Sequence, residues 1–149
     1  MKIRVIYHSR LGNTEKVAKA IAARLNVVAE KIDKKSKLSI VEPIDLLFIG
    51  DGIYWAKPHK STRKFIGGLD PEYVKTAAAF GTYGNQFKIG DDIKSLLEKR
   101  GIKIVGIPFT CKGASIGTKN ANHPDENDFN AACEFAESVV KMSADVISE

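Results

Sequence analysis

The stretch YHSRLGNTEKVA (residues 7–18) joins two segments of different periodicity, and this junction decides the fold. Residues 2–8 form an apolar run with the length of a buried strand. Residues 13–25 place Val17 and Ile21 on the same face of a helix. The pattern therefore predicts a strand, a short turn and a helix in immediate succession.

Small and hydroxyl-bearing residues fill this turn. They are Ser9, Gly12, Asn13 and Thr14. A helix N-terminus leaves unpaired N–H groups and a partial positive charge, so such a turn is suited to a phosphate group. The same residues also suit a plain turn with Asn13 or Thr14 as the N-cap, and the spacing alone leaves both interpretations open. The stretch GASIGTK (residues 113–119) looks like an ATPase loop, but its glycine spacing is wrong, and we interpret it as an ordinary loop.

Strand-like and helix-like segments alternate along the rest of the chain. Further strands are predicted at 27–32, 46–50, 76–82 and 102–109, and helices at about 60–66, at 89–100 and from Pro124 onward. Strands with helices between them indicate an α/β protein with a parallel sheet covered on both faces, in a three-layer sandwich. We find no linker or internal repeat, so residues 1–149 are expected to form a single domain.

The composition of the chain argues against several classes of protein. The chain has 149 residues, 44% of them hydrophobic, and a net charge of +5. No apolar run approaches the about 20 residues of a membrane span, and the N-terminus has no cleavage-site pattern, so we expect a cytoplasmic protein. The basic residues form no recognisable nucleic-acid motif, and we expect no nucleic-acid partner. Cys111 and Cys133 have no metal-ligand spacing, so we expect two reduced thiols and no metal site.

In a parallel α/β sheet, ligands bind beyond the carboxyl ends of the strands. Three segments should converge there: 9–14, 51–57 and 82–87. The second places Tyr54 and Trp55 side by side in DGIYWAK, and the third carries an aromatic residue in FGTYGNQFK. Such aromatics can pack under the loops, but beside a phosphate-type turn they also suit the walls of a planar ring. A phosphate at one end and a flat ring at the other describe a mononucleotide.

The motifs SRLGNTEKVA, GIYWAKP and FGTYG, and the tail PFTCKG…NHPDENDFNAACEFA, resemble the flavodoxin family over essentially the whole chain. The resemblance implies a five-stranded sheet of order 2-1-3-4-5 that binds FMN without covalent attachment. It assigns the phosphate to Ser9, Arg10, Leu11, Gly12, Asn13 and Thr14, one side of the flavin to Ile53, Tyr54, Trp55 and Ala56, and the other side to Thr82, Tyr83, Gly84 and Asn85.

The sequence departs from the family in three places. Arg10 and Leu11 stand where the family usually has a glycine and a threonine; Arg10 can donate to phosphate or point into solvent, and we favour solvent. Trp55 stands near a glycine whose peptide flips in flavodoxins, and a side chain disfavours that flip. Flavodoxins are typically acidic, whereas this chain is basic, so we expect a higher reduction potential, within the limits of screening.

The resemblance implies an electron carrier that passes electrons between redox partner proteins, a reductase and an acceptor. In that role no residue acts as a catalytic acid or base. A basic patch of Lys57, Lys60, Arg63 and Lys64 could attract an acidic partner or the 2′-phosphate of NADPH. Two alternatives remain open: an FMN-dependent NAD(P)H, quinone or porphyrinogen oxidoreductase, and a cofactor-free interaction domain.

Overall fold

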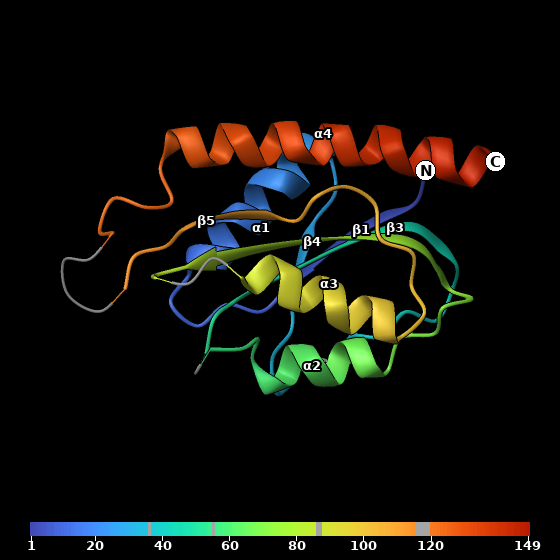
Figure 1. Ribbon diagram of the computed structural model, residues 1–149, viewed down its shortest axis with the longest axis horizontal. Helices are drawn as coiled ribbons and strands as arrows, with labels where there is room; N and C mark the ends of the chain where they lie inside the picture. The colour runs from blue at the N-terminus through green and yellow to red at the C-terminus, as the bar shows by residue number, and fades with distance from the viewer. Residues whose placement is uncertain (36, 55, 86–87, 116–119) are drawn as a thin grey trace.

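The computed structural model describes residues 1–35, 37–54, 56–85, 88–115 and 120–149. Within these residues the chain forms a five-stranded, all-parallel sheet of order β2-β1-β3-β4-β5, which confirms the predicted architecture. The strands are β1 (Ile3–Tyr7), β2 (Ala29–Lys31), β3 (Ile44–Gly52), β4 (Val74–Tyr83) and β5 (Phe109–Lys112). Figure 1 shows the sheet between two layers of helices.

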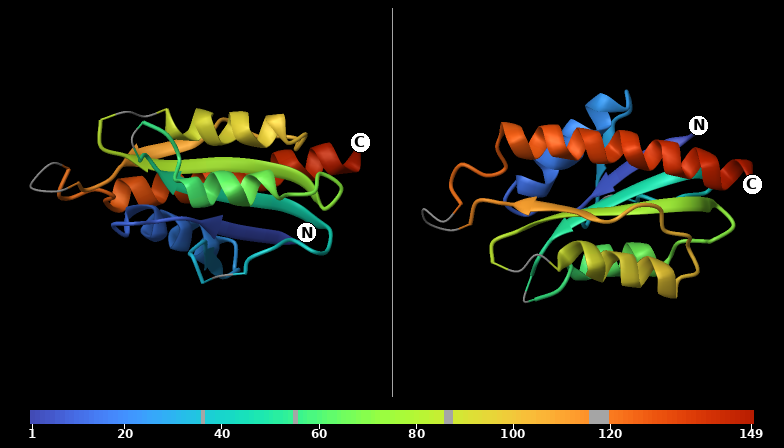
Figure 2. Two further views of the ribbon diagram at one scale, coloured as in Figure 1. Left: turned by 90° about the horizontal axis from the view of Figure 1, so that it is seen from below. Right: turned by 45° about the horizontal axis from the view of Figure 1, so that its top comes forward.

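The helices cover both faces of the sheet (Figures 1 and 2). Helices α1 (Asn13–Arg24) and α4 (Glu126–Ser148) lie on one face, and α2 (Lys60–Gly67) and α3 (Ile89–Lys99) lie on the other. Each pair seals its own apolar core. The first core includes Val17, Ile21, Phe48 and Ala136, and the second includes Ile49, Ile66, Ile93 and Leu97. Phe48 and Ile49 fall in different cores because successive residues of a strand point to opposite faces.

The central strands are buried on both faces, which is why they appear in the sequence as continuous apolar runs. In β3, the side chains from Leu46 to Asp51 are all buried. The edge strand β2 is shorter and none of its residues is fully buried. The carboxyl ends of β1, β3 and β4 consequently meet at one rim of the sheet, where the loops that follow them can form a site.

The prediction of a strand at 102–109 was wrong. The regular pairing of β5 begins only at Phe109, and before it a single bridge joins Ile104 to Ala77. Gly106 has a φ of 76°, which turns the chain, and Pro108 has no N–H group to donate to a neighbouring strand. An apolar run that looks continuous in sequence is therefore divided into a bridge, a turn and a short strand.

The helix ends follow local rules. Gly101, with a φ of 84°, ends α3 as predicted. Asp125 is the N-cap of α4 and forms a capping box with Asp128, whereas Pro124 lies one residue before the cap. No helix in the described part of the chain has both the length and the apolar character needed to cross a membrane.

Both cysteines are free thiols, as expected. Cys111 is buried in the core beneath α4, and this burial raises the pKa of its thiol to about 12. The thiol therefore stays protonated at neutral pH, where it packs as a small apolar group.

Candidate functional site

A cavity of about 340 Å³ opens at the carboxyl rim of the sheet, where the described parts of the three predicted segments converge. The predicted residues that line it are Ser9, Arg10, Leu11, Asn13, Thr14, Ile53, Tyr54, Thr82, Tyr83 and Gly84. Gly12, Ala56 and Asn85 do not line it, and Trp55 lies outside the described residues. The volume falls within the about 300–1,000 Å³ that small-molecule sites usually have.

A fourth segment that sequence analysis interpreted as an ordinary loop also lines this cavity. Gly113, Ala114 and Ser115 follow β5 and face the first loop, and Gly52 adds to the wall from the end of β3. The amide of Asn13 donates a hydrogen bond of 2.7 Å to the carbonyl oxygen of Ala114, which fixes this segment in place. A Cβ atom on Gly113 would lie only 2.8 Å from the Asn13 amide nitrogen, so the close approach requires glycine.

The first loop leaves the N-terminus of α1 open to the cavity. Gly12 is the N-cap, with a φ of 95°, so neither Asn13 nor Thr14 is the cap, and that alternative is ruled out. The N–H of Gly12 donates to the hydroxyl oxygen of Ser9 at 3.1 Å. No side chain caps the first turn, so its remaining N–H groups have no acceptor within the helix. These groups and the helix dipole favour an anion at this end of the cavity.

The polar side chains of the first loop hold the site together. Thr14 is buried and its hydroxyl lies 2.8 Å from the hydroxyl of Thr82, which joins α1 to β4. Asn13 donates to Ala114 and Thr14 shares a hydrogen bond with Thr82, whereas Ser9 accepts from Gly12 and keeps its own O–H group as a donor. The loop therefore offers an anion its backbone N–H groups and the Ser9 hydroxyl.

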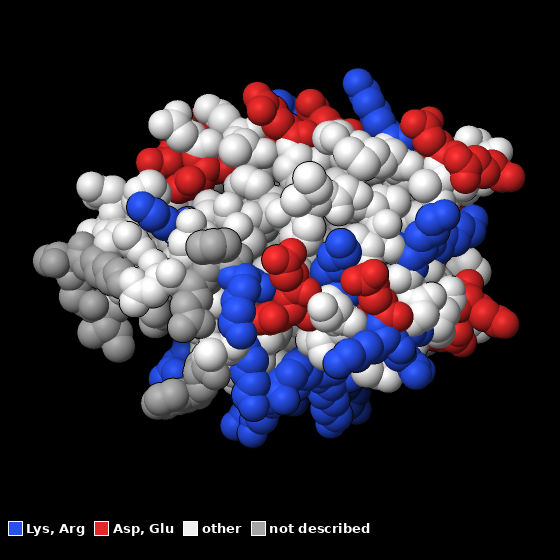
Figure 3. Space-filling model, viewed as in Figure 1, with Lys and Arg blue, Asp and Glu red and all other residues white. Residues whose placement is uncertain are grey.

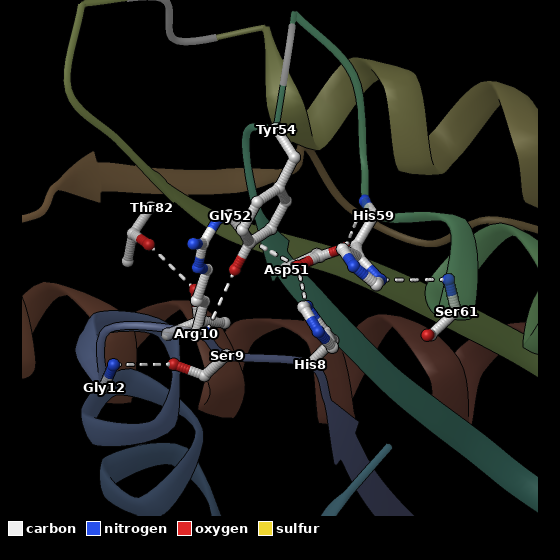
Figure 4. Close-up of polar contacts among 11 residues, drawn as sticks. His8, Ser9, Arg10, Gly12, Asp51, Gly52, Tyr54, His59, Ser61 and Thr82 are labelled. Atoms are coloured by element: carbon white, nitrogen blue, oxygen red, sulfur yellow. Dashed lines mark hydrogen bonds and ion pairs between the residues drawn. The ribbon is translucent and has the colours of Figure 1, made fainter. Parts of the chain in front are cut away.

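The two unusual residues of the first loop face outward. Arg10 is exposed, and Leu11 is 62% exposed. Their side chains therefore leave the conformation of the turn intact. The backbone N–H of Arg10 donates to the Tyr54 hydroxyl at 3.0 Å, so the second loop reaches the phosphate end of the cavity (Figure 4). Burial, together with the nearby Asp51 carboxylate, raises the pKa of Tyr54 to about 12, and the phenol keeps its proton as a donor.

A buried carboxylate organises the second loop (Figure 4). Asp51, at the end of β3, is 0% exposed. It accepts hydrogen bonds from the backbone N–H groups of Gly52 at 2.7 Å and His59 at 2.8 Å, and from Nδ1 of His8 at 2.8 Å. This one side chain therefore joins the end of β1, the end of β3 and the start of α2.

Two histidines pack beside this carboxylate. The rings of His8 and His59 stack with their centroids 4.1 Å apart, and both meet the ring of Tyr54 edge-on, at 5.3 and 5.2 Å. Nδ1 of His59 accepts from the N–H of Ser61 and so caps α2. Burial, followed by the adjacent His8, lowers the pKa of His59. Neither histidine was predicted from the sequence, and Asp51 was predicted only as the first residue of the segment 51–57, not as a binding residue.

The third loop closes the opposite side. Thr82 is buried, whereas Tyr83 and Gly84 are half-buried at the cavity. The N–H of Gly113 donates to the carbonyl of Tyr83 at 2.9 Å, and the Asn120 amide donates to the carbonyl of Gly84 at 3.1 Å. The loop after β5 therefore fixes the backbone of the third loop, and Tyr83 lines the cavity together with Tyr54.

His123, Asp125 and Asp128 also bring potential metal-ligand atoms within 4.8 Å of one another, although no metal site was expected. Nδ1 of His123 lies 2.8 Å from an Asp128 oxygen, and the two aspartates are joined in the capping box of α4. These hydrogen bonds give the group a structural role at the start of the helix.

An open helix N-terminus and two tyrosines at a cavity beyond the carboxyl ends of a 2-1-3-4-5 parallel sheet define an α/β domain with the flavodoxin-like fold. The sequence model described as "Flavodoxin domain" matches residues 4–120. The chain belongs to the flavodoxin family. An uncharacterized protein of Methanocaldococcus jannaschii is 39% identical over 152 residues, covering 95% of this chain and 99% of that relative.

Solved structures share the fold at low sequence identity. A flavodoxin from the domain Archaea has a TM-score of 0.77 at 19% identity and covers 98% of this chain and 99% of its own. Flavodoxin 2 from Bacillus cereus has a TM-score of 0.74 at 19% identity and covers 95% of this chain and 99% of its own. The rubredoxin oxygen:oxidoreductase of Desulfovibrio gigas has a TM-score of 0.80 at 18% identity over 99% of this chain, which spans only 37% of that protein.

Family membership implies a flavin cofactor, and the residues present fit one. The cavity has donors for an anion at α1 and two aromatic residues, Tyr54 and Tyr83, in its lining. The Tyr54 hydroxyl is bonded to a backbone N–H of the first loop, so it lies at the end where a phosphate would bind. The protein is therefore a flavoprotein of the flavodoxin type.

Proposed function

We propose that this protein binds FMN without a covalent bond and carries electrons between two redox partner proteins, a reductase and an acceptor. The observation that supports this most strongly is the open N-terminus of α1. Gly12 leaves its first turn without a side-chain cap at one end of a cavity flanked by Tyr54 and Tyr83. A helix terminus of this kind favours a phosphate, which distinguishes FMN from riboflavin.

The residues have separate tasks in this proposal. The backbone N–H groups of Leu11, Asn13 and Thr14 bind the phosphate, and the Tyr54 hydroxyl donates to it while accepting from Arg10. Ile53 and Tyr54 cover one side of the ring system, and Tyr83 and Gly84 cover the other. The flavin supplies the redox chemistry when bound, and the protein determines its position, exposure and electrostatic surroundings.

Surface charge supports partners with acidic surfaces. Lys57, Lys60, Arg63 and Lys64 are exposed on and before α2, close to the second loop. Figure 3 shows Lys and Arg gathered over the edge where Figure 1 places α2. Such a patch accelerates encounter with an acidic partner at low salt. It also favours the reduced, more negative cofactor, so we expect a reduction potential above that of acidic flavodoxins, and an equal or lower value contradicts this.

The buried pair of His8 and Asp51 favours a second candidate. A hydrogen-bonded imidazole and carboxylate can hold and move a proton, which a simple carrier does not need. The pair lies behind Tyr54 at the edge of the cavity. This arrangement suits an FMN-dependent oxidoreductase that acts on NAD(P)H, a quinone or a porphyrinogen.

The visible spectrum of the purified protein, followed by titration with FMN, tests the shared part of both candidates. We expect flavin absorption bands, or stoichiometric uptake of added FMN. A colourless protein that takes up no FMN contradicts both and supports the cofactor-free alternative. Anaerobic NADPH then separates the two: a carrier stays oxidised until a reductase is added, whereas an oxidoreductase is bleached at once.

A further inference from the structure

A second and larger cavity lies on the α2 side of the sheet. Its volume is about 820 Å³, compared with about 340 Å³ for the flavin cavity. Residues 32–34 and 38–40, which follow β2, form one wall, and helix α2 forms the other. We call it the α2 groove. Its volume lies within the about 300–1,000 Å³ that is usual for small-molecule sites.

The floor of the α2 groove is apolar and recessed. Ile32, Ile40 and Leu69 are buried there, with exposed fractions of 5%, 8% and 3%. Leu38 and Phe65 are half-buried and close its sides. All five side chains belong to the core that α2 and α3 seal, so the floor is a stable part of the fold. Such a floor favours an apolar body that is narrow enough to enter.

The rim of the α2 groove is positive. Lys34, Lys60 and Lys64 line it, all exposed, and α2 itself contains no acidic residue. Among the described residues, none of these three ammonium groups forms an ion pair with a carboxylate. The one acidic residue in the lining, Asp33, accepts a hydrogen bond from the N–H of Lys35. Three lysines and one aspartate give the lining a net charge of +2, which suits an anionic group.

The α2 groove is separated from the flavin cavity by the aromatic cluster described above. Ser61 lines the groove, and its N–H is bonded to His59 at 3.1 Å. His59 in turn meets the edge of Tyr54, which lines the flavin cavity. Figure 4 shows these rings side by side at the end of β3. A molecule in the groove would therefore lie across these rings from the flavin.

We propose that the α2 groove binds a small amphipathic anion, with an aromatic or aliphatic body on the apolar floor and a carboxylate or phosphate at the lysine rim. A small molecule fits better than a protein segment because α2 has only eight residues, a length of about 12 Å. That is too short for the several anchors that a helix docked in a groove requires. The proposal does not depend on which cofactor the first cavity holds.

Titration of isotope-labelled protein with 1-naphthylacetate, followed by two-dimensional amide NMR, tests this directly. We expect saturable shifts at the amides of Ser61, Phe65, Gly68 and Leu69, which line the groove. The uncharged 1-naphthylacetamide, of nearly the same shape, should bind about five- to tenfold more weakly because it lacks the anionic group. The titration is repeated with added FMN, and the affinity for the probe should not change.

Matched variants separate the two contributions. The double variant Lys60→Gln/Lys64→Gln should lower the affinity for the acetate to that for the acetamide, whereas Lys141→Gln, exposed on α4, should leave both unchanged. Leu38→Ser should weaken both probes alike. The absence of saturable shifts, shifts located elsewhere, or equal affinities for acetate and acetamide would overturn the proposal. Shifts at the groove produced by hexaglutamate but not by the acetate would also overturn it, in favour of an acidic protein partner.

Discussion

The two loops that face each other at the phosphate end of the cavity are held by different kinds of contact. In the first loop, short neutral hydrogen bonds join Ser9 to Gly12 and Thr14 to Thr82. In the second loop, one buried carboxylate, Asp51, accepts three hydrogen bonds from three separate parts of the chain. Many small contributions stabilise the first loop, whereas the second depends on a single charged group.

The first loop therefore mainly supplies binding groups, whereas the second loop mainly sets the charge at the edge of the cavity. The first loop presents backbone N–H groups, whose number and position change little with any one side chain. The second loop brings a negative charge, two histidines and a tyrosine to the edge of the cavity. We therefore expect substitutions in the first loop to have limited effects, and substitutions around Asp51 to alter stability, cofactor affinity and pH dependence.

The largest expected effect is the loss of stability in Asp51→Ala. Three half-buried donors lose their acceptor, so the free energy of unfolding should fall by about 3 kcal/mol. Ser9→Ala, which removes one neutral acceptor in the first loop, should cost only about 1 kcal/mol. Urea unfolding of both variants measures the difference, with the exposed Asp145→Ala as a control. Equal losses for the two sites would contradict the contrast between the loops.

Tyr54→Phe should weaken FMN binding about ten- to thirtyfold, because the charged phosphate loses one hydrogen bond. Riboflavin, which has no phosphate, should bind the variant as well as it binds the wild type. Quenching of flavin fluorescence measures both affinities. A parallel loss for FMN and riboflavin would show that the Tyr54 hydroxyl does not donate to the phosphate.

Gly113→Ala tests the segment after β5. The added Cβ would lie 2.8 Å from the Asn13 amide nitrogen, so that side chain must move and its bond to Ala114 weakens. We expect FMN affinity to fall about fivefold. Gly67→Ala, where a Cβ meets nothing within 4 Å, is the matched control and should bind FMN normally. An unchanged affinity for Gly113→Ala would remove this segment from the site.

The smallest expected effect is on the pH dependence of stability. Burial and the adjacent His8 lower the pKa of His59 below its usual value of 6.5. As the pH falls, His59 therefore takes up a proton in the unfolded chain before it does so in the folded protein. The stability that is present above pH 6.5 is lost as the pH falls through the lowered pKa of His59. His59→Asn keeps an acceptor for the N–H of Ser61 but does not titrate. Between about pH 7.5 and about pH 5, the variant should lose less stability than the wild type.

Urea midpoints at the two pH values measure that difference. His59 is surrounded by His8, Asp51, Lys60 and Arg63, whose charges also act on its pKa. A variant that keeps all four should therefore change only the contribution of His59 itself. An identical loss of stability in wild type and variant would show that the histidine titrates no differently in the folded protein.

The spacing of apolar residues along the sequence was enough to predict most of the helices and strands. The apolar runs of β1, β3 and β4 and the helical faces of α1, α3 and α4 are local patterns, and each element formed where they indicated. The prediction of a strand at 102–109 failed because it followed the apolar run and gave too little weight to Gly106 and Pro108, two residues that signal a break in a strand. The sheet order came from the family resemblance and not from the periodicity of the strands.

The candidate site was predicted wherever its residues follow a strand end directly. The loops at 9–14 and around Tyr54 and Tyr83 were found in this way. The missing parts depend on contacts between distant residues: Asn13 with Ala114, and His8 with Asp51 and His59. A single sequence does not indicate these pairs, because nothing local to His8 or Ala114 distinguishes them from ordinary loop residues.

The measurement that tests the central claim most directly compares FMN with riboflavin in equilibrium titrations of the cofactor-free wild-type protein. If the open N-terminus of α1 binds a phosphate, FMN should bind at least about a hundredfold more tightly than riboflavin. The difference should decrease at high salt, because screening weakens the attraction. Equal affinities for the two flavins, or no binding of either, would contradict the assignment of this cavity as a phosphate-bearing flavin site.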